Sequence, residues 1–151
     1  MALEQQIMTQ LKAAMLAKNV VALRSLRAIK AAILLAKTSE GAAGKLTTDG
    51  EIKLLQKMVK QRKDSLEIFT QQGREDLAQK EREEIAVIEK FLPEQMDAAA
   101  VRAVLVQLVA QTGANSPADM GKMMGLANKE LAGKAEGKMI ATIVRELLSG
   151  Q

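Results

Sequence analysis

Two apolar stripes at helical spacing, separated by one glycine, most constrain what this chain can fold into. Apolar residues recur every three or four positions in residues 52–69 and again in residues 77–92, which is the period of one helix face. Gly73 lies between the two stripes and is a natural helix terminator. The pattern therefore predicts two antiparallel helices joined at Gly73. The stripe members are Ile52, Leu55, Val59, Leu66, Phe69, Leu77, Ile85, Ile88 and Leu92.

Charged residues interrupt both stripes. Arg62 lies in the first, while Glu81 and Glu84 lie on the second. Arg62 precedes Gly73 by eleven residues and Glu84 follows it by eleven, so a hairpin brings the two charges together. We predict a partly buried Arg62–Glu84 ion pair that fixes the register of the hairpin. The alternative is that each side chain extends along the stripe edge to solvent.

The remaining sequence is also helical in character. The chain is 48% apolar, with two Phe, no Tyr and no Trp. Good helix formers dominate, and the only prolines are Pro93 and Pro117, so little interrupts helix formation. Val and Ile occur mostly at helical spacing rather than in alternation. These observations predict an all-α protein.

Pro93 marks the boundary between two helical parts, because a proline disfavours helix at the residue before it. We predict an N-terminal domain of four helices, residues 1–93, and a compact C-terminal domain of three helices, residues 96–151. Thr48 or Asp49 is expected to cap the third helix, and Asp97 the fifth. Ser116 and Pro117 are expected to start the sixth helix. The expected helices are 2–18, 20–39, 48–72, 74–91, 98–111, 117–132 and 139–148, with a loop at 41–44.

Several classes of chemistry are disfavoured by composition. Cysteine and histidine are both absent, so disulfides, ordinary zinc or haem sites and thiol or imidazole catalysts are not expected. No Ser–Lys spacing or acid pair forms a catalytic constellation, and we predict no cofactor or metal. No secretory signal is visible, and no apolar run approaches the ~20 residues of a membrane span. The expectation is a cytoplasmic protein without membrane contact.

Positive charge is concentrated in the first half of the chain. Residues 12–63 contain twelve basic and three acidic residues, although the whole chain carries only +4. Each lysine alone is best interpreted as part of a solvated face, whereas the set could hold a phosphate backbone. Two phenylalanines cannot stack many bases, so the expected ligand is a folded RNA contacted at its phosphates. The candidate residues are Arg24, Arg27, Lys30, Lys53, Lys57 and Lys60.

A second candidate site lies in the C-terminal part. Lys122, Lys134 and Lys138 place charge around a 133–138 loop that precedes a helix, and helix N-termini attract anions. Gly121 and Gly125 are four residues apart within the sixth helix. They are interpreted as sites of close helix–helix packing or as weak helix positions.

Six short segments resemble the YqeY family. They are LRSLRAIKAA (23–32), KQRKDS (60–65), GREDLA (73–78), FLPEQ (91–95), DMGKMMG (119–125) and GKAEGK (133–138). The resemblance covers essentially the whole chain. The family is similar to the C-terminal tail of the GatB component of the tRNA-dependent Asp/Glu amidotransferase, which implies an all-α protein of two helical parts. It also implies RNA binding, with Lys122, Lys134 and Lys138 in the matching motifs.

Two functional classes follow from the residues and the resemblance. In the amidotransferase the tail helps to hold tRNA, while glutamine hydrolysis and amide transfer occur elsewhere. The kinase-like catalytic portion of the GatB component is not in this sequence, so carbon–nitrogen ligase activity with glutamine as donor is not expected here. The first class is a non-catalytic module that binds tRNA or a tRNA-bearing enzyme. The second is a protein-interaction or scaffold module that uses the same helices without RNA, which the low aromatic content and the Met-rich face of the C-terminal domain favour.

Overall fold

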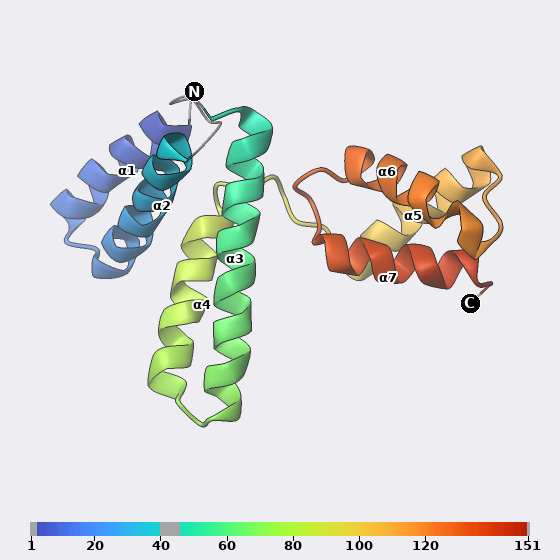
Figure 1. The fold of residues 1–151 in the computed structure, drawn as a ribbon. Coiled ribbons are helices and arrows are strands. Elements are labelled where there is room, and N and C mark those ends of the chain that lie inside the picture. The colour runs from blue at the N-terminus through green and yellow to red at the C-terminus, as the bar shows by residue number, and fades with distance from the viewer. Residues whose placement is uncertain (1–2, 40–45, 151) are drawn as a thin grey trace. The chain divides into compact units, whose positions relative to one another are not determined.

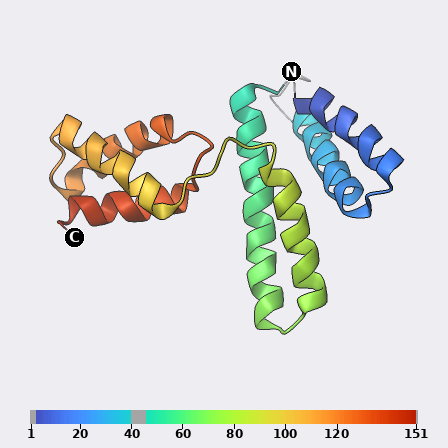
Figure 2. The same ribbon diagram turned by 180° about the vertical axis from the view of Figure 1, so that it is seen from behind.

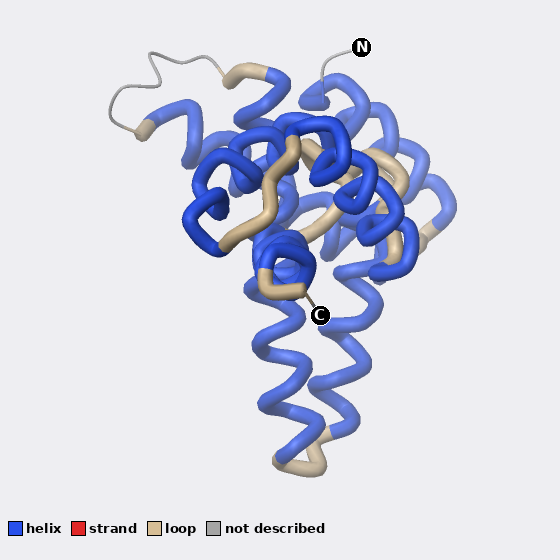
Figure 3. The backbone as a smooth tube through the Cα atoms, turned by 90° about the vertical axis from the view of Figure 1, so that its right-hand side faces the viewer, coloured by secondary structure: helices blue, strands red, loops and turns tan. Residues whose placement is uncertain are grey.

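The computed structural model describes residues 3–39 and 46–150, and every regular element in these ranges is helical (Figures 1 and 3). The all-α prediction is therefore confirmed. The predicted 41–44 loop lies outside the described residues. The helices are α1 (Leu3–Ala17), α2 (Val20–Thr38), α3 (Thr48–Gln71), α4 (Glu75–Glu89), α5 (Ala98–Thr112), the 3-10 helix η1 (Pro117–Asp119), α6 (Met120–Glu130) and α7 (Gly137–Leu148).

Side-chain caps start three of the helices. Asn19 accepts the backbone N–H of Ala22 at 3.1 Å, and Asp97 accepts that of Ala100 at 2.8 Å. Thr47, rather than Thr48 or Asp49, caps α3, because its extended backbone places its hydroxyl 3.0 Å from the N–H of Gly50. Each cap satisfies a backbone donor that has no partner inside its helix.

The start of the sixth helix and the start of the seventh differ from the sequence prediction. Pro117 begins the short η1, and α6 follows only from Met120. Helix α7 begins at Gly137 instead of Met139, because Glu136 is the last residue with an extended backbone. Lys138 therefore lies in the first turn of α7 and not in the preceding loop.

The chain divides into two compact units, residues 1–92 and 93–151. In the first unit, α3 and α4 form an antiparallel hairpin that turns at Gly73, whose φ of +70° suits glycine (Figure 2). Helix α2 packs against α4, and α1 packs against α2. The largest fully buried side chains of this unit are Ile7, Leu26, Ile29, Leu55 and Ile88.

The second unit is built from α5, α6 and α7 around a separate apolar core that includes Val101, Leu105, Met123 and Val144. Two hydrogen bonds join the segment before α5 to the loop before α7. The Gln95 side chain donates to the Gly133 carbonyl at 2.7 Å, and the Met96 N–H donates to the Lys134 carbonyl at 2.8 Å. The starts of α5 and α7 are therefore held at the same end of this unit.

Candidate nucleic-acid interface

The outer surface of α6 lacks side chains at two positions. Gly121 and Gly125 are both exposed, and a Cβ atom added at either would meet nothing within 4 Å. The interpretation as a close helix–helix contact is therefore wrong. Helix α6 instead contacts its neighbours through the opposite side, where Met123 and Ala127 are fully buried. The two glycines leave the α6 backbone open to a partner from outside.

Two exposed lysines flank this bare surface. Lys122, Gly125 and Lys129 follow one another at spacings of three and four residues, so they share one side of α6. Lys129 was not among the sequence candidates, although its position seven residues after Lys122 could have revealed it. Asp119 lies close to Lys122. Its pKa is lowered by hydrogen bonds from the backbone N–H groups of Asn115 and Ser116, and further by the charge of Lys122.

Lys134 and Lys138 lie at the far end of α6 from Lys122. The Lys134 side chain is exposed in the loop between α6 and α7, and Lys138 is exposed in the first turn of α7. Eleven residues of α6 span roughly 16 Å at 1.5 Å per residue. The structure thus brings Lys134 and Lys138 to one end and leaves Lys122 at the other, with Lys129 between them along the chain.

A cavity of about 620 Å³ opens beside Lys138, between the start of α5 and most of the length of α7. Its walls are mainly apolar and include Ala98, Met139 and Ile143. Arg102 and Glu146, which form an ion pair across α5 and α7, also line it. The volume lies in the range of small-ligand sites, and the lining combines apolar contact with a few charged groups.

The basic residues of α2 and α3 divide into two groups. Arg27, Lys30, Lys53, Lys57 and Lys60 are exposed, and none of them forms an ion pair with another described residue. These five side chains are available to an external anion.

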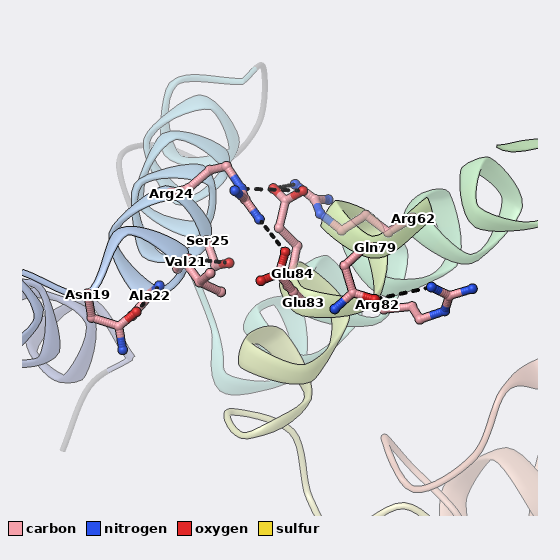
Figure 4. Close-up of polar contacts among 10 residues, drawn as sticks. All are labelled: Asn19, Val21, Ala22, Arg24, Ser25, Arg62, Gln79, Arg82, Glu83 and Glu84. Carbon is pink, nitrogen blue, oxygen red and sulfur yellow. Dashed lines mark hydrogen bonds and ion pairs between the residues drawn. The ribbon is translucent and has the colours of Figure 1, made fainter. Parts of the chain in front are cut away.

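Arg24 is instead directed into the protein, towards α4. Its guanidinium lies 3.6 Å from a Glu83 oxygen and 4.0 Å from a Glu84 oxygen (Figure 4). Its side chain is about one-third exposed, at 34%. The reason is that the Arg24 side of α2 is the side that packs on α4. Arg24 therefore differs from Arg27 and Lys30, with which the sequence grouped it.

Arg62 and Glu84 face one another across the α3–α4 hairpin (Figure 4). Arg62 Nη2 lies 3.7 Å from Glu84 Oε1, and their side chains are only 18% and 16% exposed. Arg62 Nη1 also donates to the Met58 carbonyl at 3.2 Å. With Arg24, the cluster links α2, α3 and α4. Arg24 Nε and Nη2 and Arg62 Nε are buried without a hydrogen-bond partner, so the cluster is held mainly by charge.

Glu81 lies one turn before Glu84 on α4, and the cluster changes the pKa of its carboxyl group. Burial and the neighbouring Glu84 charge raise its pKa, and Arg62 and Arg24 offset only part of the effect. A carboxyl whose pKa is raised by folding favours the folded state most below its unfolded pKa. That contribution is lost as pH rises through the folded pKa. At neutral pH, ionised Glu81 is thus a destabilising group.

We predict that Glu81→Gln raises the melting temperature at pH 7, because the amide removes a partly buried negative charge beside Glu84. The gain should shrink as pH falls towards 4, where the wild-type carboxyl becomes protonated. Circular dichroism melting curves of both proteins across this range measure the effect. A gain that is the same at both ends of the range would contradict the electrostatic explanation.

A family model described as Yqey-like protein matches residues 4–148. The chain belongs to the YqeY family. Two relatives share the name "Altered inheritance of mitochondria protein 41, mitochondrial". The protein from Clavispora lusitaniae is 41% identical over 91 residues, which cover 60% of this chain and 52% of the relative. The protein from Pyrenophora tritici-repentis is 37% identical over 87 residues, 57% and 46% of the two chains. The YqeY chain spans about half the length of these relatives.

These relatives correct the expected location. Both are named as mitochondrial proteins, so the expectation of a cytoplasmic protein is wrong. That expectation rested on the absence of a secretory signal and of a spanning segment, and neither absence distinguishes the cytoplasm from the interior of an organelle.

The described part of the YqeY chain contains neither a membrane-spanning helix nor a metal-binding cluster of acidic side chains. Within these residues, no helix is long and apolar enough to cross a membrane. The same residues contain no cluster of three or more acidic side chains placed to hold a metal ion.

Proposed function

We propose that this YqeY-family chain is an RNA-binding module that recognises a folded RNA of the tRNA type. The proposed contact surface is the outer side of α6 together with the start of α7. The observation that carries the proposal is the exposed backbone at Gly121 and Gly125, flanked by Lys122 and Lys129. Glycine permits close approach of a ligand to the protein backbone, and lysines supply the charge that phosphates require.

Two further features support this proposal. Lys122, Lys134 and Lys138 lie in motifs that resemble the tRNA-holding GatB tail of the amidotransferase. In addition, the exposed Lys53, Lys57 and Lys60 of α3 offer more phosphate contacts. Aromatic residues make up only 1% of the chain, which favours recognition of RNA shape and phosphates over base stacking.

The direct test is a titration of labelled tRNA with the full chain at two salt concentrations, followed by fluorescence anisotropy. If about four phosphates are neutralised, raising salt from 50 to 200 mM should weaken binding by about fifty-fold or more. Absence of binding at the lower concentration would overturn the proposal. Binding that does not change with salt would also contradict it, because phosphate contacts release counterions.

The glycines provide a second test that separates binding from folding. Gly125→Ala should stabilise α6 by about 0.5–1 kcal/mol, since alanine is the better helix former and its methyl group meets nothing within 4 Å. The same methyl group would obstruct close approach of RNA, so affinity for tRNA should fall.

The matched control is Gln107→Ala, which changes an exposed position on α5 rather than on α6. It should leave RNA affinity unchanged. Thermal melts and the same anisotropy titration supply both measurements. If Gly125→Ala is more stable and binds tRNA as well as wild type, RNA does not approach this surface.

A protein-interaction module without RNA is the second candidate. The Met-rich face of the C-terminal domain gives this candidate little support, because Met123 is fully buried in the core. The cavity between α5 and α7 is the observation that favours it, since its apolar lining could receive a partner side chain. Association through this cavity would depend little on salt.

A further inference from the structure

Exposed apolar side chains gather on the first two helices. Among the described residues, six of the nine exposed large apolar side chains belong to α1 and α2. Leu16 is 87% and Val20 is 70% exposed, and both lie at the corner where α1 turns into α2 at Lys18. Isolated exposed apolar residues are normal, but a grouped set rimmed by polar residues marks an interaction surface. The six are Met8, Met15, Leu16, Val20, Leu34 and Leu35.

Helical spacing places three of these residues, Met8, Met15 and Leu34, on one face of the α1–α2 hairpin. On α1, Glu4, Met8, Lys12 and Met15 share one side at spacings of four, four and three. The Lys37 ammonium of α2 lies 2.7 Å from the Glu4 carboxylate, so this side of α1 adjoins the Lys37 side of α2.

The Lys37 side of α2 carries further exposed residues. Arg27, Lys30, Leu34 and Lys37 follow one another at spacings of three, four and three. Arg24, which borders this stripe beside Arg27, faces α4 instead. The two stripes therefore form one face, here called the hairpin face. Its exposed members are Met8, Lys12, Met15, Arg27, Lys30 and Leu34, with Leu16, Lys18 and Val20 at the corner.

The hairpin face combines aliphatic side chains with positive charge. Glu4 is the only acidic residue described on α1 and α2, and it is already paired with Lys37. Long basic side chains extend their charged ends to phosphates while aliphatic groups beside them enter an apolar layer. An amphipathic surface of this kind binds in the interface of membranes that contain anionic lipids.

We propose that the hairpin face binds peripherally to an anionic membrane surface, with Leu16 and Val20 entering the boundary of the acyl chains. Such a helix pair would lie on the membrane rather than cross it, which agrees with the lack of a spanning helix among the described residues. This proposal goes beyond RNA binding, and it departs from the expectation of no membrane contact, which considered only spanning segments.

Other occupants of the hairpin face fit less well. A symmetric contact with a second copy would bring two copies of the same basic face together, so the positive charges of Lys12, Arg27 and Lys30 would repel those of the copy. An RNA would use the basic residues and leave Met15, Leu16 and Val20 without a role. A protein partner that binds as a helix needs a groove, whereas Leu16 and Val20 protrude.

The test is co-flotation of the full chain with vesicles of phosphatidylcholine, alone or with about 30% phosphatidylglycerol. We expect binding only to the anionic vesicles. The double variant Leu16→Ser/Val20→Ser should lower partitioning at least about ten-fold, because the apolar area of two side chains is lost. Lys12→Glu/Arg27→Glu should lower it as well. Both pairs are exposed, and circular dichroism checks that the variants fold.

Control measurements separate this proposal from RNA binding. Leu126→Ser, at an exposed position of α6, should float like wild type. Leu16→Ser/Val20→Ser should bind tRNA like wild type. The membrane proposal and the RNA proposal are therefore tested independently, and either can fail without affecting the test of the other. The proposal is overturned if anionic vesicles do not float the protein, or if Leu16→Ser/Val20→Ser floats equally well. Salt-insensitive self-association that depends on Leu16 and Val20 would overturn it in favour of a second copy.

Discussion

Replacing Arg62 with methionine should lower the stability of the first unit by about 2–4 kcal/mol, because Glu84 would keep its charge in a mostly buried position. Arg24 lies 4.0 Å from Glu84 and would offset part of this cost. Adding Glu84→Leu should recover most of the loss, since the two stripes would then be continuously apolar. Replacing a buried ion pair by apolar residues is often neutral or stabilising.

Native-state hydrogen exchange of the α3 and α4 amides is the suitable measurement, because it reports on this hairpin separately from the second unit. Lys60→Met, at an exposed position of the same helix, is the matched control and should change stability little. If the double variant is as unstable as the sum of the two single variants, Arg62 and Glu84 are not coupled.

Charge reversal on the proposed RNA surface, on α6 or around the start of α7, should produce the largest changes in RNA affinity. Lys122→Glu/Lys129→Glu is expected to weaken tRNA binding by at least about a hundred-fold at low salt, because two phosphate contacts become repulsive. Lys134→Glu/Lys138→Glu should have an effect of similar size. The slope of affinity against salt should become shallower in both variants, since fewer counterions are released. Fluorescence anisotropy at several salt concentrations measures both quantities.

Lys80→Glu/Lys90→Glu provides the control for net charge. These two lysines are exposed on and just after α4, and their reversal changes the net charge of the chain by the same amount. This variant should bind tRNA nearly as well as wild type. Equal weakening by the α4 and α6 variants would mean that only the overall charge of the protein matters and that α6 is not a specific surface.

Much of the local structure could be predicted from the sequence, because it depends on residues within one helical turn. Apolar period and composition indicated an all-helical chain, and the YqeY resemblance is confirmed by the family match. Asp97 caps its helix as expected, through a contact only three residues away. Thr47 was missed, because neighbouring Thr48 and Asp49 are equally good caps and only the backbone conformation distinguishes them.

What the tertiary structure decided is which side of each helix meets another helix. Arg24, Arg27 and Lys30 look alike in sequence, yet only Arg24 lies against Glu83 and Glu84, because α2 packs on α4 with that side. Gly121 and Gly125 similarly could have been packed or open, and they are open because Met123 and Ala127 occupy the contact. Periodicity carries information over about four residues. The contacts of Arg24 with Glu83 and Glu84 join residues that are dozens of positions apart in the chain. The exposure of Gly121 and Gly125 depends on how the core orients the whole of α6.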